Sequence, residues 1–334
     1  MTFRPIVCPG CAKGCNITVE ASRGAIRRLR PRVNLDVNEY WMCDHGRFDF
    51  KYVRGEKRLD RVQARDGERR LFPTVDEACS KTIVGLTEVG REFGAASLAL
   101  IADLFMTNEE LFVFRELARK LGVTRIGVVG GPVKTEEVFP RFRIPADKNP
   151  NREGARRILG SDAVDGGYAK ILEGLKSGAV KGLYVHVGVP RFEPAEDLVR
   201  ALEGIEFLVF HGIESGALER AAHLAIPGAT SFEKGGTFTN DAGRTQRIRP
   251  GVRPPEGVEP DLWVLQRLAG LAGAARERVE PLSDRAVTKR LAAEVDGFRD
   301  LAAVDLDAVP RRPNYLMNPS PRGLSAGKAS SRGK

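Results

Sequence analysis

Four of the five cysteines lie within the first 43 residues, and their spacing suits metal ligation. Cys8, Cys11 and Cys15 follow the pattern Cys-x2-Cys-x3-Cys, and 27 residues separate Cys15 from Cys43. Three closely spaced thiolates can hold three corners of an iron–sulfur cube, and a distant fourth can close the remaining corner. Tetrahedral zinc also takes four cysteines, but structural zinc sites usually pair two Cys-x-x-Cys motifs, and here the second is missing. The spacing therefore favours one [4Fe–4S] cluster over zinc and over unligated thiols.

The residues around these cysteines fit a ligand loop. Gly10, Gly14 and Gly46 permit the turns that let backbone N–H groups point at sulfur. The arginines between the third and fourth cysteines either stabilise a reduced, more anionic cluster or form the solvated face of a hairpin. The fifth cysteine, Cys79, lies one turn into a predicted helix and is expected to be a small core residue.

The remaining candidate residues, all histidines, show no sequence pattern of a catalytic or metal site. His186 and His211 lie at the ends of predicted strands, but no partnering carboxylate is evident, so we expect histidines of the core or of its rim. His45 follows a cysteine ligand closely and is expected to tune the cluster or to lie at the surface. We find no Ser/His/Asp order, no carboxylate pair suited to catalysis and no Gly-x-Gly-x-x-Gly dinucleotide motif.

The elements that must position these residues alternate between strand and helix. Thr-x-x-Glu capping boxes open two predicted helices, at 74–93 and 107–121. Further helices are predicted at 168–177, 195–203 and 217–221. Five apolar runs are predicted strands, at 97–102, 125–129, 182–187, 206–211 and 223–226. This alternation predicts an α/β fold with a doubly wound, mostly parallel sheet covered on both faces.

The chain divides into four expected parts. Residues 1–55 form a small N-terminal 4Fe-4S cluster-binding domain, with short strands at 16–21 and 25–30. Residues 56–255 form the α/β domain, with a loop or hairpin at 56–72, an irregular excursion at 133–165 and a glycine-rich hairpin at 235–246. Residues 256–309 hold two helices, at 260–277 and 284–298. Residues 310–334 are rich in Pro, Gly, Ser and basic residues, which is typical of a disordered tail.

Composition, charge and hydropathy argue against several classes of protein. The 334 residues contain 42% hydrophobic residues, enough for a packed core. The net charge is +9, yet no helix shows a basic face with interleaved aromatics, so we expect no nucleic-acid partner. The longest apolar stretch, 95–106, is too short to cross a bilayer and is broken by Asp103. We find neither an apolar signal core nor a twin-arginine motif, so a cytoplasmic location is expected, with membrane contact only through a complex.

Several segments resemble a known family. Residues 8–17 and the Cys-Asp-x-Gly-Arg-Phe element at 43–48 are similar to the cluster-binding domain of the molybdopterin oxidoreductase superfamily, and in particular to the G subunit of NADH-quinone oxidoreductase (respiratory complex I). Residues 146–151 and 233–246 are similar to the same family. The resemblance implies Cys8, Cys11, Cys15 and Cys43 as ligands of the 4Fe-4S cluster. It also implies an electron-transfer or structural subunit with a quinone as final acceptor.

Departures from the family narrow this expectation. Catalytic relatives carry a molybdenum ligand after the region matching 107–122, a lysine two residues after the fourth cysteine, where this chain has His45, and a C-terminal barrel. Because we find none of these three features, we expect the α/β domain to be a degenerate molybdopterin oxidoreductase domain without molybdopterin catalysis. The G subunit also carries a ferredoxin-like segment, which is expected here as a separate subunit beside an NADH-oxidising one. An iron–sulfur subunit of a formate dehydrogenase or hydrogenase, and a zinc-stabilised scaffold, are the alternatives.

Overall fold

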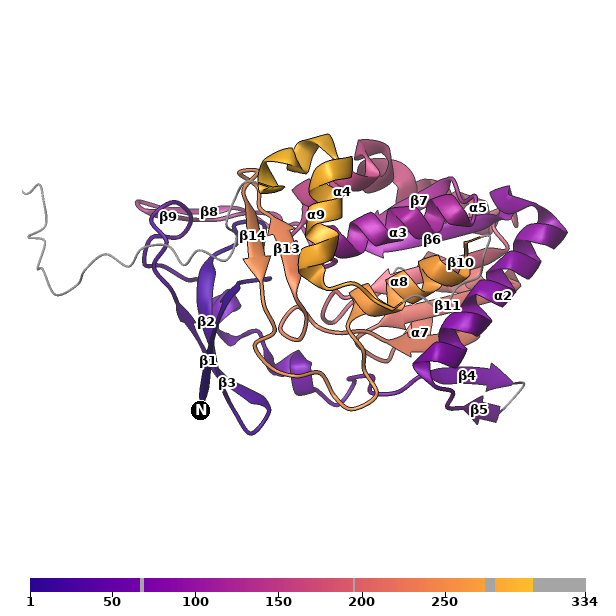
Figure 1. Ribbon diagram of the computed structural model, residues 1–334, viewed down its shortest axis with the longest axis horizontal. Coiled ribbons are helices and arrows are strands. Elements are labelled where there is room, and N and C mark those ends of the chain that lie inside the picture. The colour runs from indigo at the N-terminus through magenta and orange to yellow at the C-terminus, as the bar shows by residue number, and fades with distance from the viewer. Residues whose placement is uncertain (67–68, 195, 274–279, 303–334) are drawn as a thin grey trace, which may run out of the picture.

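The computed structural model describes residues 1–66, 69–194, 196–273 and 280–302. A three-stranded N-terminal sheet lies beside a larger unit built on a seven-stranded sheet, as Figure 1 shows. The α/β class and the largely parallel central sheet expected from the sequence are confirmed. The expected domain boundaries stay a prediction, and the tail expected at 310–334 lies outside the described residues.

The N-terminal sheet is antiparallel. It consists of β1 (Thr2–Val7), β2 (Asn16–Ser22) and β3 (Ala25–Pro31) in that order. The predicted β2–β3 hairpin is confirmed, and its turn residues Arg23 and Gly24 have φ values of 52° and 74°, as a tight two-residue hairpin turn requires. The loop between β1 and β2 carries three cysteines, so the sheet fixes both ends of that loop.

The larger sheet has the strand order β5-β4-β12-β11-β10-β6-β7. Its parallel part consists of the five predicted strands, namely β6 (Leu98–Asp103), β7 (Arg125–Val129), β10 (Gly182–Val187), β11 (Phe207–Gly212) and β12 (Leu224–Pro227). The hairpin of β4 (Gln63–Asp66) and β5 (Arg69–Leu71) extends this sheet, because β4 pairs antiparallel with β12.

The winding of the sheet reverses between β6 and β10. In chain order the parallel strands lie in the sequence 2-1-3-4-5 across the sheet, and the two central strands of the reversal are β6 and β10. Ligands of open α/β sheets bind beyond the carboxyl ends of the strands at such a reversal. The residues at the carboxyl ends of β6 and β10 are therefore candidates for a ligand-binding site.

One layer of helices covers the first face of the sheet. It contains α2 (Val75–Phe93), α3 (Asn108–Lys120), α4 (Arg152–Leu159), α8 (Asp261–Leu271) and α9 (Asp284–Glu294). These helices share a core with the strand residues Leu100, Tyr184 and Val209. Both predicted capping boxes are present, with Thr74 at the start of α2 and Thr107 at the start of α3.

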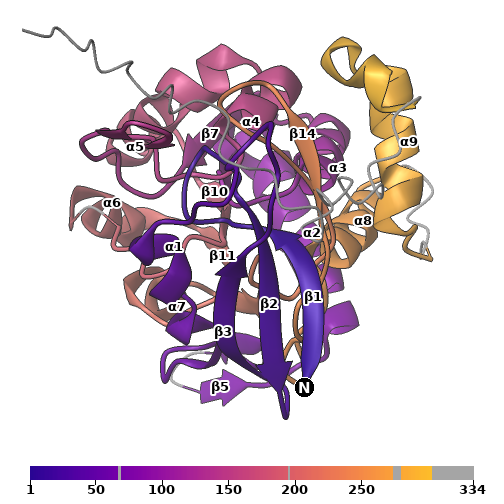
Figure 2. The same ribbon diagram turned by 90° about the vertical axis from the view of Figure 1, so that its left-hand side faces the viewer.

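A second layer covers the opposite face. It contains α5 (Tyr168–Lys176), α6 (Glu196–Ala201) and α7 (Ala217–Ala221), and it shares a core with Ile101 and Phe210. Successive residues of a strand point to opposite faces, which explains why neighbouring positions serve different layers. Figure 2 shows the two helix layers on either side of β7, β10 and β11.

Residues 133–165 are more regular than expected. They contain a hairpin of β8 (Glu137–Phe139) and β9 (Phe142–Ile144), then α4 and a helical turn at Ala163–Gly167. These elements are too short for an apolar period to develop, and Pro140 lies in the hairpin turn itself. The sequence therefore gives little sign of them.

The later elements largely follow the sequence. The glycine-rich hairpin is present as β13 (Gly236–Thr239) and β14 (Thr245–Ile248), which lie between the N-terminal sheet and the helices in Figure 1. α8 ends at Leu271, and the expected helical residues 274–277 lie outside the described residues. α9 ends at Glu294, before the expected end at 298. Within the described residues, every helix is too short or too polar to cross a membrane.

Candidate metal centre

The loop between β1 and β2 gathers three cysteines. The backbone closes this loop through a hydrogen bond from Cys8 N–H to Cys15 carbonyl oxygen at 2.8 Å. The side chains of Cys8, Cys11 and Cys15 are all buried. Gly14 has a φ of 67°, and a Cβ at this position would lie 2.6 Å from Gln246 Nε2. Glycine is therefore required for the turn that directs these thiols inward.

Cys43 reaches the same place from a different segment. It caps the short helix α1 (Asp44–Phe48), and its Sγ accepts a hydrogen bond from Gly46 N–H at 3.3 Å. A Cβ on Gly46 would lie 3.0 Å from Cys8 Sγ and 3.5 Å from Cys43 Sγ. The sulfur atoms of the two segments thus both lie close to Gly46, where a side chain would crowd Cys8.

The spacing of these sulfur atoms is wider than zinc requires. Zinc–sulfur bonds of about 2.3 Å in a tetrahedron place the sulfur atoms roughly 3.8 Å apart. Among the described residues, no three cysteine sulfur atoms lie within 4.8 Å of one another. Within the described residues, no three of these thiols therefore have the spacing of a tetrahedral zinc site.

The electrostatics of the cysteine pocket favour a bound cation. Burial, and then the neighbouring cysteines, raise the pKa of Cys8 well above its usual range. Burial also raises the pKa of Cys11 to about 11, although a backbone hydrogen bond from Lys13 lowers it. Four thiolates in this pocket therefore need positive charge beside them, and iron ions would supply it.

The hairpin motif at 233–246 braces the cysteine loop. Gln246 donates from Nε2 to the Gly14 carbonyl oxygen at 2.9 Å and accepts at Oε1 from Asn16 Nδ2 at 2.6 Å. Asn240 Nδ2 donates to the Lys13 carbonyl oxygen at 3.1 Å. This motif therefore positions the cysteine loop against the α/β unit.

A second bracing contact comes from the motif at 146–151. The Ala12 N–H donates to the Asp147 carbonyl oxygen at 3.0 Å. Farther along the same motif, Asn151 bonds the Met106 carbonyl oxygen and the Thr239 N–H, both within buried surroundings. Both motifs singled out in the sequence thus hold the metal loop in place.

His45 lies beside the cysteine loop at the surface. Its side chain is 49% exposed, and its Nε2 lies 3.6 Å from Asp49 Oδ2. It lines a cavity of about 220 Å³ between the cysteine loop and the carboxyl edge of the sheet, together with Gly10, Phe105 and Arg191. Cys79, by contrast, is fully buried in the core under α2, as predicted.

A separate polar cluster lies where the winding of the sheet reverses. Asp103, the last residue of β6, accepts from His186 Nδ1 at 2.5 Å and from Gly188 N–H at 2.8 Å. Asp261, at the start of α8, lies 3.4 Å from His186 Nε2 and 3.2 Å from His211 Nε2. All four side chains are fully buried.

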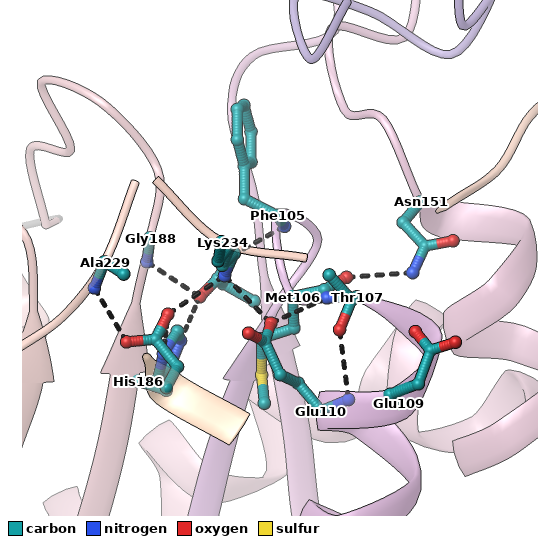
Figure 3. Close-up of polar contacts among 12 residues, drawn as sticks. Phe105, Met106, Thr107, Glu109, Glu110, Asn151, His186, Gly188, Ala229 and Lys234 are labelled. Carbon is teal, nitrogen blue, oxygen red and sulfur yellow. Dashed lines mark hydrogen bonds and ion pairs between the residues drawn. The ribbon is translucent and has the colours of Figure 1, made fainter. Parts of the chain in front are cut away.

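Lys234 joins this cluster to α3. Its Nζ donates to Asp261 Oδ2 at 2.9 Å and to Glu110 Oε2 at 2.8 Å, and Figure 3 shows it beside His186 and Glu110. Burial lowers the pKa of His186, but the carboxylates of Asp103 and Asp261 outweigh burial and raise it to about 9.

The sequence did not reveal the acidic partners of the two histidines. His186 and His211 are in the core, as predicted, but each has a carboxylate within reach, contrary to the expectation that partners are absent. Asp103 could have been found, because it directly follows the predicted strand at 97–102, and the carboxyl ends of parallel strands meet at one edge of a sheet. Asp261 could not, since only the packing of α8 brings it there.

Two family models match parts of this chain. Residues 11–51 match "NADH-ubiquinone oxidoreductase NDSU1/NuoG-like, 4Fe-4S domain", and residues 142–271 match "Molybdopterin oxidoreductase". The first match contains Cys11, Cys15 and Cys43, and Cys8 shortly precedes it. The chain is therefore similar to the iron–sulfur domain of the complex I type in its first matched region and to the molybdopterin oxidoreductases in the second.

The particular relatives agree with the resemblance found in the sequence. The chain is 40% identical over 91 residues to the G subunit of NADH-quinone oxidoreductase from Pseudomonas putida, covering 26% of this chain and 10% of that protein. It is 34% identical over 141 residues to NADH-quinone oxidoreductase subunit 3 of Thermus thermophilus, covering 42% and 17%. It is 31% identical over 156 residues to NADPH-Fe(3+) oxidoreductase subunit alpha of Geobacter sulfurreducens, covering 45% and 18%. The resemblance to the G subunit is confirmed, although each of these matches spans less than a fifth of the relative.

A solved structure supports the fold alone. Acetylene hydratase from Pelobacter acetylenicus superimposes with a TM-score of 0.54 at 8% identity, covering 82% of this chain and 70% of that chain. At this identity the similarity concerns the architecture and not the chemistry.

Proposed function

We propose that Cys8, Cys11, Cys15 and Cys43 hold one [4Fe–4S] cluster, and that the chain is an electron-transfer or structural subunit of a complex-I-like NADH-quinone oxidoreductase. The observation that carries this proposal is the meeting of Cys8 and Cys43 at Gly46, which brings both cysteine segments to one buried pocket. The names of the relatives supply the kind of complex.

The residues of the chain have clear tasks in this proposal. The bound cluster supplies one-electron transfer. The four thiolates hold it, and the Gly46 N–H donates to Cys43 sulfur, which stabilises negative charge on the ligand. The cysteine loop is buried, so water is excluded from three of the four ligands. No substrate bond is made or broken by this chain.

Partners and location follow from the same proposal. A subunit with a single cluster needs a donor and an acceptor, so we place a ferredoxin-like and an NADH-oxidising subunit beside it, on the cytoplasmic side of a membrane complex. A formate dehydrogenase or hydrogenase complex would use the same site. Identification of the subunits that copurify with the chain distinguishes these assemblies.

We also propose that the chain carries out no molybdopterin catalysis. This part of the proposal is supported by the departures in the sequence: a molybdenum ligand is missing after the region matching 107–122, and His45 occupies the position where catalytic relatives carry a lysine. Molybdenum analysis of the purified complex tests this part: molybdenum at one equivalent per chain would contradict it.

The main experiment is anaerobic purification of the chain followed by iron and sulfide analysis and EPR spectroscopy of the reduced protein. We expect about four iron and four acid-labile sulfide per chain. Cys43→Ala should abolish the EPR signal of the intact cluster. Cys79→Ala is the matched control, since Cys79 lies in the core far from the pocket, and should keep the signal. Absence of iron and sulfide from the wild-type protein would overturn the proposal.

A further inference from the structure

The polar cluster at the reversal of the sheet has the composition of a metal site. One nitrogen each from His186 and His211 and one oxygen from Asp261 lie within 4.8 Å of one another, and all three side chains are buried. The distances from Asp261 oxygens to the two Nε2 atoms are 3.4 and 3.2 Å. Metal–nitrogen bonds of about 2.0–2.1 Å in a tetrahedron separate neighbouring ligand atoms by roughly 3.3–3.4 Å. The two separations between Asp261 and the histidines are thus close to those of neighbouring ligands around one small ion.

The outer nitrogen of each histidine is already held. His186 Nδ1 is bonded to the Asp103 carboxylate at 2.5 Å, and His211 Nδ1 to the Tyr184 hydroxyl at 2.7 Å. Metal-ligating histidines nearly always have their second nitrogen fixed by such a partner, which sets the tautomer and the ring orientation. When a metal ion displaces the extra proton of His186, both rings are neutral with Nδ1 as the donor, and both Nε2 atoms present a lone pair towards Asp261.

In the described part of the chain, the inner nitrogens, which face Asp261, make no hydrogen bond of normal geometry. Within the described residues, His186 Nε2 and His211 Nε2 are buried and make no hydrogen bond. A carboxylate offers about four lone-pair sites. On Asp261 the Ala229 N–H and the Lys234 ammonium occupy one site on each oxygen, at 2.8 and 2.9 Å. One site on each oxygen remains, and these are the oxygens that the two Nε2 atoms approach.

The net negative charge of the buried polar cluster favours binding of a divalent cation. The buried carboxylates of Asp103, Glu110 and Asp261 face a single buried ammonium, that of Lys234. An excess of negative charge in the protein interior is costly unless a cation or protons neutralise it. With neutral imidazoles, one divalent ion balances the ionised carboxylates and the ammonium.

We propose that His186, His211 and Asp261 bind one divalent transition-metal ion, Zn²⁺ in the first instance. Two imidazole nitrogens and one carboxylate oxygen are a ligand set that zinc and iron(II) accept. The ion joins the start of α8 to the carboxyl ends of β10 and β11, so its role is to fix α8 on the sheet. This site is separate from the four cysteines.

The test loads the anaerobically purified, iron-containing chain with one equivalent of Zn²⁺, removes unbound metal and measures zinc by mass spectrometry and zinc-edge X-ray absorption. We expect about one zinc per chain with nitrogen and oxygen neighbours only. His211→Gln should lose this zinc and keep its iron. His223→Gln is the control, because His223 is only half-buried and its Nδ1 accepts from Leu208 N–H outside the cluster.

The outcomes separate the two sites. Zinc with sulfur neighbours would place the ion in the cysteine pocket and overturn both this proposal and the proposed iron–sulfur site. A wild-type chain that keeps its iron but retains no zinc would overturn this proposal alone, and protons on the cluster would then balance its charge. If His211→Gln fails to fold, Tyr184→Phe replaces it, and zinc affinity should fall about 10–100-fold because only the partner of His211 is lost. Unchanged affinity in Tyr184→Phe would contradict the proposed ligand geometry.

Discussion

Gly46 lies directly against the sulfur of Cys8, and a Cβ at this position would be 3.0 Å from that atom. Real Cβ atoms rarely make so close a contact, so the sulfur must move if Gly46 gains a side chain. The same Cβ would lie 3.5 Å from Cys43 sulfur, which is an ordinary contact, so the sulfur of Cys8 is the one that must move.

Gly46→Ala is therefore expected to weaken the cluster without removing any ligand. Iron retention against a chelator should fall about tenfold, the lower end of the effect of changes just outside a ligand shell. Iron release under an external chelator measures this. Gly204→Ala is the control, because a Cβ at Gly204 meets nothing within 4 Å. Equal retention in both variants would show that Gly46 does not constrain the sulfur atoms.

Lys234→Met is expected to destabilise the chain strongly. The substitution removes the ammonium that Glu110 and Asp261 share and leaves buried carboxylates uncompensated. Breaking a buried ion pair in this way costs about 3–5 kcal/mol. Urea unfolding followed by circular dichroism gives the change, with the exposed Lys81→Met as a control within about 0.5 kcal/mol of wild type. A loss below about 1 kcal/mol for Lys234→Met would contradict the charge accounting.

Neighbouring glycines before α5 should respond in opposite ways to the same substitution. A Cβ on Gly167 would lie 2.2 Å from the Ile126 carbonyl oxygen of β7, whereas a Cβ on Gly166 meets nothing within 4 Å. Gly167→Ala should cost about 1–3 kcal/mol through overpacking. Gly166→Ala should be neutral or stabilise by up to about 1 kcal/mol, because alanine restricts the unfolded chain. Thermal unfolding of the two variants tests the close packing of this segment on β7, and similar melting temperatures would refute it.

Glu109 should make stability depend on pH in the mildly acidic range. Burial raises the pKa of Glu109, more than the Thr288 hydroxyl and the Thr237 groups lower it. The folded state therefore binds a proton more readily than the unfolded state above about pH 4.3, the usual glutamate value. Stability must fall as pH rises from there to the folded pKa, by at most about 1.4 kcal/mol per pH unit for one group.

Glu109→Gln removes this titration. Its unfolding free energy should decline less with rising pH through the same window than that of the wild-type chain. The exposed Glu88→Gln on α2 should retain the wild-type slope. Parallel slopes for Glu109→Gln and wild type, measured by urea unfolding at several pH values, would show that burial of Glu109 does not govern the dependence.

Local signals explain how much of the fold could be predicted. The capping boxes at Thr74 and Thr107 fix helix starts through contacts three residues apart, and both occur as predicted. The parallel strands could be found because each is an apolar run between helices, and β10 has the bounds predicted from its sequence. β1 could not be predicted, because its first three residues, up to Arg4, are exposed and only Ile6 and Val7 are buried and apolar. Two apolar residues are too few to indicate a strand.

The two candidate sites differ in the same way, since local sequence indicates one of them and only tertiary packing forms the other. Cysteine spacing indicates metal ligation from sequence alone, and the structure brings Cys43 to the loop that holds the other three. The pairing of His186 and His211 with Asp261 depends on how α8 packs across the strand ends. No local pattern encodes that packing, so a search for nearby carboxylates in the sequence fails.

The hydrogen bonds of Gln246 to Gly14 and Asn16 carry a consequence for biosynthesis. They join positions separated by 232 and 230 residues. While the ribosome has yet to add Gln246, the loop bearing Cys8, Cys11 and Cys15 lacks this clamp. Delivery of iron and sulfide to a fully shaped pocket thus belongs to a late stage of synthesis, after the second half of the α/β unit has emerged and folded.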